Sequence, residues 1–179
     1  MNYQDILNFW YAPETQPNWF AKSSEFDQML AEKFSQIHQQ AALGELWAWR
    51  QQPEGRLAEV IILDQFSRNL YRDQAAAFAH DALALGLAQE AILGQHHLQL
   101  SPEQRYFLYM PFMHSESQRV HEFGLSLFEQ LGHPIALEFE RQHKAIIDRF
   151  GRYPHRNHIL GRSSSAEELE FLTQPNSHF

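Results

Sequence analysis

The chain has 179 residues, 44% of them hydrophobic, and its 22 acidic and 14 basic side chains give a formal charge of −8. These values indicate one soluble globular domain over residues 1–179. The negative charge argues against nucleic-acid binding, and no apolar run approaches the ~20 residues of a membrane-spanning helix. The chain has no cysteine, which excludes disulfides and thiolate metal sites, and its first residues lack a signal-peptide pattern. We therefore expect a cytoplasmic protein.

Apolar residues recur at helical spacing through most of the chain, which predicts an all-α fold. The first predicted helix covers residues 24–44, with Ser24 as its cap, and a short segment containing two tryptophans follows. The second predicted helix begins at Pro53 and ends within residues 64–69. The third is rich in alanine, begins with Asp73 as its cap and ends at residue 94.

The second half of the chain has repeated start and stop signals for helices. A capping box at residues 101–104 begins a helix that Pro111 should end or kink, and residues 115–118 repeat the capping pattern before a helix ending at residue 132. Further helices are predicted from residue 134 to 151 and, after another capping box at residues 165–168, up to Pro175. About seven helices joined by short turns are typical of packed antiparallel helix hairpins.

Residues 62–69 and 146–153 resemble each other in their apolar, acidic, aromatic and basic positions. One interpretation is a duplicated corner that faces a ligand. The other is that each segment ends a helix, where arginine is electrostatically favoured and buried Ile and Phe are common.

Positive charge gathers near the C-terminal end of this acidic chain. Between Arg141 and Arg162 there are six Lys or Arg residues and one acid, Asp148, whereas the rest of the chain has eight and 21. Arginine offers a planar fork to carboxylate or phosphate, so this segment is a candidate anion site. The alternative is that these arginines pair with acids elsewhere in the chain. The first-choice side chains are Arg149, Arg152, Arg156 and Arg162.

Several of the eleven histidines lie in or near the same segment, and His114, Glu116 and His143 are candidate catalytic groups. Imidazole and carboxylate groups can bind zinc, manganese or iron, but the spacings match no metal motif. His114 and Glu116 are two residues apart, so their side chains converge only on extended backbone. We therefore predict no bound metal and no cofactor.

Three long motifs resemble an uncharacterised bacterial family, domain of unknown function 924. They are Ile-Leu-Asp-Gln-Phe-Ser-Arg-Asn at residues 62–69, Tyr-Met-Pro-Phe-Met-His-Ser-Glu at 109–116, and Arg-Phe-Gly-Arg-Tyr-Pro-His-Arg-Asn at 149–157, followed by Leu-Gly-Arg at 160–162. Ser67 replaces the proline that is usual in the first motif. The resemblance implies a single helical domain similar to tetratricopeptide repeats, and it implies no established reaction.

The resemblance also selects a set of polar residues, most of them at helix ends. They stand at matching motif positions: Asp64, Gln65, Arg68, Asn69, His114, Glu116, His143, Arg152, His155, Arg156 and Asn157. A shared polar site explains such a set, and a buried hydrogen-bond network that fixes the helix corners explains it almost as well.

Three hypotheses of function follow. The first is a binding module whose three motifs converge on a pocket for a small anionic ligand or a peptide carboxylate. The second is a hydrolase, with or without a metal, in which His114 or His143 is the general base, Glu116 orients it, and Arg152 and Arg156 hold the substrate. The third is a structural or protein-interaction scaffold without a pocket. The sequence predicts no oligomeric state. The expected ligand-binding residues are Asp64, Gln65, Arg68, Asn69, Arg152, His155, Arg156 and Asn157.

Overall fold

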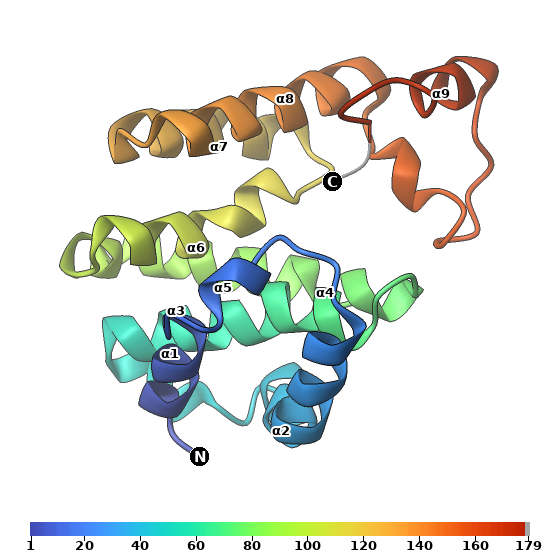
Figure 1. Cartoon of the computed structure of the whole chain (residues 1–179). Helices are drawn as coiled ribbons and strands as arrows, with labels where there is room; N and C mark the ends of the chain where they lie inside the picture. Colours follow the sequence, from blue (N-terminus) through green and yellow to red (C-terminus); the bar gives the residue numbers. More distant parts are fainter. Residues whose placement is uncertain (178–179) are drawn as a thin grey trace. The chain divides into compact units, whose positions relative to one another are not determined.

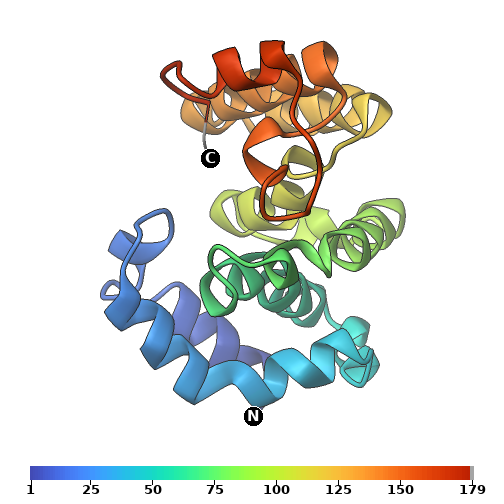
Figure 2. The same ribbon diagram turned by 90° about the vertical axis from the view of Figure 1, so that its right-hand side faces the viewer.

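The computed structural model describes residues 1–177, and in this part of the chain it contains helices and turns but no strand (Figures 1 and 2). The predicted all-α class is confirmed. The chain divides into two compact units, which we describe separately. The first comprises Met1–Arg72 and Ala76–Pro111, and the second comprises Asp73–Ala75 and the chain from Phe112 onwards. The expectation of one domain over residues 1–179 stays a prediction.

The helices follow one another with short connections. No helix in residues 1–177 is both long enough and apolar enough to cross a membrane. The α-helices are α1 (Tyr3–Trp10), α2 (Ser24–Ala42), α3 (Pro53–Ile61), α4 (Ser67–Leu70), α5 (Asp81–Leu93), α6 (Pro102–Met113), α7 (Gln118–Leu131), α8 (Pro134–Phe150) and α9 (Ala166–Phe171).

Local capping explains several of the helix ends. Ser165 and Glu168 form the predicted capping box of α9, and Gly132 and Gly151 adopt φ values of +70° and +69° where α7 and α8 end. The cap of α2 lies one residue before the predicted Ser24, because the Ser23 hydroxyl accepts the hydrogen bond from the amide of Phe26.

In the N-terminal half of the chain the structure differs from the sequence analysis at two helices. Helix α1 was not predicted, although the Asn2 side chain caps it and Asp5 completes a capping box. Asp73 does not begin the third predicted helix, since α5 begins at Asp81. Asp73 has a φ of 60°, whereas an N-cap residue has extended backbone.

Two predictions in the middle of the chain were met only in part. Pro111 was predicted to end or kink its helix, and α6 continues two residues past it to Met113, so the helix does not end at the proline. Helix α7 has Ser117 as its N-cap, but the Ser117 side chain makes no capping hydrogen bond. The predicted capping pattern at residues 115–118 therefore fails, and the carboxylate of Glu116 bonds to residues far along the chain instead.

The first unit has an aromatic core. Trp10, Phe34, Phe66 and Phe107 are almost fully buried. The ring of Phe66 lies 5.0 Å from that of Phe34 and 5.6 Å from that of Trp10, measured between centroids. These rings come from α1, α2, α6 and the segment after α3, so burying them joins four parts of the chain.

A buried ion pair lies on α3. The carboxylate of Glu59 is fully buried, and both its oxygens accept hydrogen bonds of 2.7 Å from the guanidinium of Arg50. Arg50 belongs to the 3-10 turn Trp47–Gln51, which precedes α3. We call such a pair, in which one guanidinium donates to both oxygens of one carboxylate, an arginine fork. Burial of a carboxylate is costly unless it is paired, so this fork fixes the turn against the helix.

We expect Arg50→Ala to lower the free energy of unfolding by about 3 kcal/mol, because it leaves the buried Glu59 charge uncompensated. Urea denaturation measures the change. Arg141→Ala is the matched control, since Arg141 and Glu129 are both more than half exposed and 4.0 Å apart, and we expect it to cost below about 0.5 kcal/mol. Equal losses in the two variants would contradict the assignment.

Candidate functional site

The first motif lies in the first unit, and a stretch of π-helix at Ile62–Phe66 buries its polar side chains. The Asp64 carboxylate lies 3.2 Å from Nη1 of Arg68 and accepts a 2.6 Å hydrogen bond from the Gln65 amide. Arg68 also donates two hydrogen bonds of 3.0 Å to Asp81, which begins α5. π-Helical turns occur often at functional sites, and here the turn brings Asp64 into contact with Arg68.

Asn69, the last residue of the first motif, is hydrogen-bonded to another carboxylate, that of Asp27. Its amide donates to Asp27 Oδ1 at 2.8 Å, and Arg72 donates to both oxygens of the same carboxylate. Burial raises the pKa of Asp27, but the hydrogen bonds from Arg72 and Asn69 and the charge of Arg72 together lower it below its ordinary value. The four predicted residues of the first motif thus all contact other residues of the first unit.

In the second unit the helices α7 and α8 form a hairpin joined by two residues (Figure 1). The chain beyond α8 contributes to a hydrophobic cluster near the C-terminal end of α8. Tyr153, Ile146 and Ile147 form that cluster, with Phe150 and Phe171 packed against it. The predicted hairpin arrangement is therefore present here. Within this unit, residues of the second motif lie beside residues of the third.

Tyr153 is fully buried and makes hydrogen bonds through each of its polar groups. Its hydroxyl donates to the carbonyl of Met113, its amide donates to Glu116 Oε1 at 2.7 Å, and its carbonyl accepts from Arg162 at 3.2 Å. One side chain and its backbone therefore join α6, the loop before α7 and the loop before α9.

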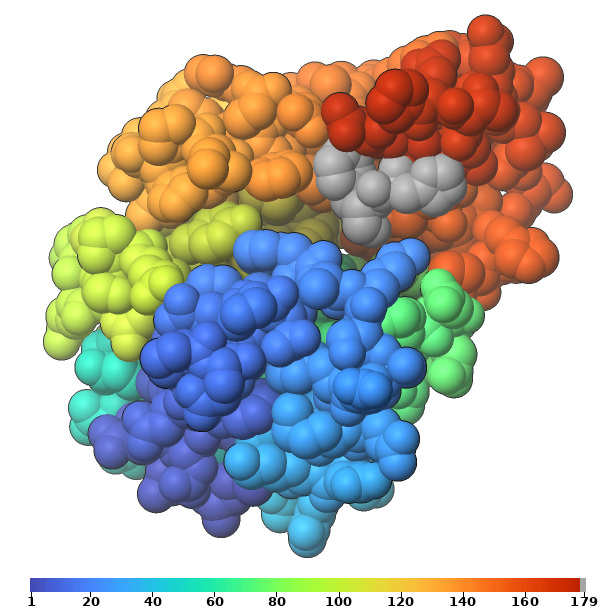
Figure 3. Space-filling view, viewed as in Figure 1, coloured from blue at the N-terminus to red at the C-terminus, as the bar shows by residue number. Residues whose placement is uncertain are grey.

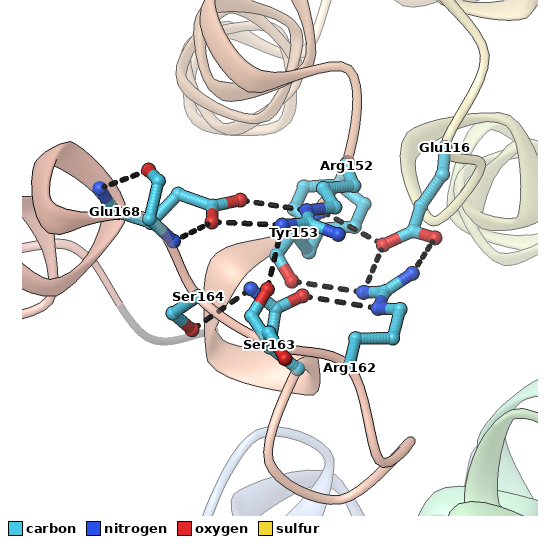
Figure 4. Close-up of polar contacts among 9 residues, drawn as sticks. Glu116, Arg152, Tyr153, Arg162, Ser163, Ser164 and Glu168 are labelled. Carbon is cyan, nitrogen blue, oxygen red and sulfur yellow. Dashed lines mark hydrogen bonds and ion pairs between the residues drawn. The ribbon is translucent and has the colours of Figure 1, made fainter.

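Glu116 is held by the same loop. Arg162 donates to both oxygens of its carboxylate, at 2.6 and 2.8 Å, as Figure 4 shows. Burial raises the pKa of the Glu116 carboxyl, but the hydrogen bonds from Arg162 and Tyr153 and the charges of Arg156 and Arg162 outweigh it and lower the pKa. Glu116 is therefore an ionised structural partner of Arg162.

Arg152 forms a second fork. It donates to the two oxygens of Glu168 at 2.6 and 2.8 Å and to the carbonyl of Ser163 at 2.9 Å (Figure 4). The Glu168 side chain is 4% exposed, and it also caps α9 by accepting from the amide of Ser165. The hydrogen bond from Arg152 is the main reason that the pKa of Glu168 falls to about 2.

Asn157 connects these two forks. It is fully buried, its amide donates to the Ser164 hydroxyl at 3.0 Å, and its carbonyl oxygen accepts from Nε of Arg162 at 3.0 Å. The loop from Tyr153 to Ser165 is thus held by side chains within it as well as by Glu116 and Glu168. Its geometry is fixed without any external group.

His121 and Glu140 form a fully buried pair between α7 and α8, with 2.8 Å between Nδ1 and Oε1. His121 Nε2 lies 2.8 Å from the carbonyl oxygen of Ser115, which can accept but not donate, so Nε2 carries a hydrogen. Burial raises the pKa of Glu140. The hydrogen bond between Nδ1 and Oε1 then requires a proton on one of these two atoms.

The remaining nitrogen-bearing side chains gather around the ring of Tyr153. The guanidinium of Arg156 lies 4.5 Å from the ring centroid, and the rings of His143 and His155 lie 5.7 and 5.6 Å from it. The ring of His114 lies 6.5 Å from that of His143. We call His114, His143, His155 and Arg156 the Tyr153 cluster.

His143 is neutral in this setting. Burial is the main cause that lowers its pKa to about 3, and the nearby His114, His121 and Arg156 lower it further. Its Nδ1 lies 2.7 Å from the carbonyl oxygen of Phe139 and must donate to it, so the acceptor nitrogen of the neutral ring is Nε2.

The structure brings the second and third motifs together and shows which arginines contact carboxylates. Arg152 and Arg162 hold Glu168 and Glu116, and Arg149 pairs with Glu167 on the surface. The expectation that the first motif joins the same pocket stays a prediction. Sequence reasoning missed Tyr153, His121, Glu140 and Glu168 as members of the network, although the capping box at Ser165 marked Glu168 as a fixed residue.

Metal ligands are a separate question. Within residues 1–177 no group of three or more His, Cys, Asp or Glu side chains is arranged to hold a metal ion. The rings of His143 and His155 lie beside the Tyr153 ring, as does the guanidinium of Arg156.

We expect the contribution of Glu168 to stability to depend on pH. Its pKa in the folded chain, about 2, lies below the ordinary 4.5, so the unfolded chain takes up the proton first as the pH falls. The difference in unfolding free energy between the parent and Glu168→Gln should be full above pH 4.5 and shrink towards pH 2. Urea titrations at a series of pH values measure it.

Glu167→Gln is the control for this experiment, because Glu167 is 62% exposed in its pair with Arg149. Its effect should be small at every pH. A difference between the parent and Glu168→Gln that did not change with pH would contradict the role given to the Arg152 fork.

Comparison with known proteins agrees with this architecture. The family model described as bacterial protein of unknown function, DUF924, matches residues 6–176. A solved protein of unknown function from Agrobacterium tumefaciens is 38% identical, with a TM-score of 0.88 over 95% of this chain and 96% of that one. The comparison with curated proteins finds no match. The chain belongs to the DUF924 family of bacterial proteins.

Proposed function

We propose that the protein is a binding module for a small anionic ligand, a phosphate or a carboxylate, and that the Tyr153 cluster is its binding site. The observation that carries this proposal is that Arg156, His143 and His155 lie around one buried ring, with His114 beside His143. These side chains come from the residue after α6, from α8 and from the 3-10 turn Pro154–Arg156. Guanidinium and imidazole groups are the usual protein donors to phosphate and carboxylate oxygens.

Arg156 is the main ligand-binding residue in this proposal. Its side chain is 6% exposed, and its guanidinium lies over the Tyr153 ring, which restricts its movement. A fixed planar fork loses little conformational entropy when it binds an anion. His143 contributes through its depressed pKa, because a bound anion would offset the burial and the positive neighbours that disfavour its protonated form.

The two carboxylate forks give the site its rigidity. Arg152 and Arg162 are engaged with Glu168 and Glu116, so we assign them to building the loop rather than to holding the ligand. Asn157 has the same supporting role. A rigid surrounding shell keeps the binding groups in position before the ligand arrives. Participation of Asp64, Gln65, Arg68 and Asn69 in the same pocket remains part of the prediction.

The hydrolase hypothesis receives less support from the geometry. It required Glu116 to orient His114 or His143, but both oxygens of Glu116 accept hydrogen bonds from Arg162 and the Tyr153 amide. The scaffold hypothesis agrees with the ion pairs that Arg152 and Arg162 form. The following experiment distinguishes the scaffold hypothesis from the binding-module hypothesis.

We expect inorganic phosphate to raise the melting temperature of the parent protein more than chloride does at equal ionic strength. A ligand at a hundred times its dissociation constant stabilises by about 2.7 kcal/mol. Arg156→Ala should lose the response, and Arg156→Lys should retain part of it because it keeps the charge without the fork. Differential scanning calorimetry measures both.

Arg149→Ala is the control variant, because it removes a nearby positive charge whose pair with Glu167 is exposed. It should keep the phosphate response. A parent protein that responds equally to phosphate and chloride, or an Arg156→Ala variant with an undiminished response, would contradict the proposal and favour the scaffold hypothesis.

A further inference from the structure

A second surface lies in the first unit, far along the sequence from the Tyr153 cluster. The helices α1 and α2 and the loop between them line a groove of about 860 Å³. Figure 3 shows the N-terminal segment and α2, both blue, on the face of the molecule seen there. The volume lies within the range of about 300–1,000 Å³ that is usual for ligand sites.

The floor of the groove is aromatic. Phe9, Phe26 and Phe34 line it, together with the partly exposed Met29. The ring centroid of Phe9 lies 4.6 Å from that of Phe34 and 6.1 Å from that of Phe26. Aromatic and methionine side chains in a groove between helices are typical of surfaces that receive an apolar side chain from another molecule.

The rim of the groove is acidic. Asp5, Glu14 and Glu25 line it, against one lysine, Lys33. Within the described residues neither the Glu14 nor the Glu25 side chain has an ion-pair or hydrogen-bond partner. These carboxylates do not stabilise the fold through a pair, unlike Glu59, Glu116 and Glu168.

Lys33 shows how the floor receives a cation. Its ammonium lies 4.9 Å from the ring centroid of Phe9 and 5.3 Å from that of Phe34. The lysine is exposed and long, so the ring of Phe9, which is partly exposed, becomes accessible to a cation from outside when the lysine side chain moves away.

We propose that this groove docks a peptide segment of a partner protein in which an apolar anchor is flanked by lysine or arginine. The anchor packs on the partly exposed Phe9 and Met29, which the buried Phe34 supports from below, and the flanking cations pair with Glu14 and Glu25. Charge complementarity selects this occupant, because an acidic rim repels anionic lipid headgroups and nucleic-acid phosphates. The surface is independent of the anion site, and its charge is opposite in sign.

The test uses the full chain and two fluorescein-labelled synthetic peptides with the same helical pattern of leucines, one carrying lysines and the other glutamates. Fluorescence anisotropy should show binding of the Leu/Lys peptide in the micromolar range and at least tenfold weaker binding of the Leu/Glu peptide. The double variant Glu14→Lys/Glu25→Lys should bind the Leu/Lys peptide at least tenfold more weakly than the parent.

The matched control is Glu122→Lys/Glu170→Lys, which reverses two exposed carboxylates of the second unit and changes the net charge by the same amount. It should bind the Leu/Lys peptide within about twofold of the parent. A loss as large as that of the groove variant would mean that the peptide responds only to net charge, and it would overturn the proposal.

Met29→Gln tests the apolar part of the groove with no change of charge. Met29 is 37% exposed, so the variant should fold, which circular dichroism checks, and it should bind the Leu/Lys peptide several-fold more weakly. Unchanged binding by this variant, or stronger binding of the parent to anionic phosphatidylserine vesicles than to the Leu/Lys peptide, would also overturn the proposal.

Discussion

Burial of Tyr153 is the constraint on which the second unit depends. A tyrosine in the interior needs a partner for its hydroxyl, and the carbonyl of Met113 supplies it. The amide and carbonyl of the same residue bond to Glu116 and Arg162, so the position that fills the core also fixes the loop. The ring in turn contacts Arg156, His143 and His155, so the proposed binding site is a consequence of the packing.

Arginine forks to carboxylates recur in both units. Arg50 holds Glu59, Arg162 holds Glu116 and Arg152 holds Glu168. Glu59 and Glu168 are buried carboxylates that would be costly to bury alone, and their forks join a helix to an irregular segment, whereas Arg162 and Glu116 join two loops. The local excess of positive charge between Arg141 and Arg162 is thus used in part to neutralise acids from elsewhere in the chain. Arg156 of the Tyr153 cluster belongs to the same positive segment, and it is the residue for which we propose a ligand.

The two proposed surfaces use opposite electrostatics on separate elements. The Tyr153 cluster presents guanidinium and imidazole nitrogens, whereas the groove of α1 and α2 presents carboxylates over aromatic rings. A chain of net charge −8 attracts cations in general, which explains why an anion site requires a dedicated local concentration of arginine and histidine. The acidic rim of the groove needs no local concentration of one charge in an acidic chain. In our proposal its selectivity for a particular cationic peptide comes from the apolar floor beside the carboxylates.

The sequence by itself determined the all-α class and the helix ends that short-range bonds make, such as the Ser165 cap and the left-handed glycines at Gly132 and Gly151. Those features depend on a few neighbouring residues, so periodicity and capping signals reveal them. The start of α5 and the passage of α6 through Pro111 depended on packing, and the sequence signals there were misleading. The tertiary structure alone decided which arginine meets which carboxylate, because Arg162 and Glu116 are 46 residues apart and either could have paired elsewhere.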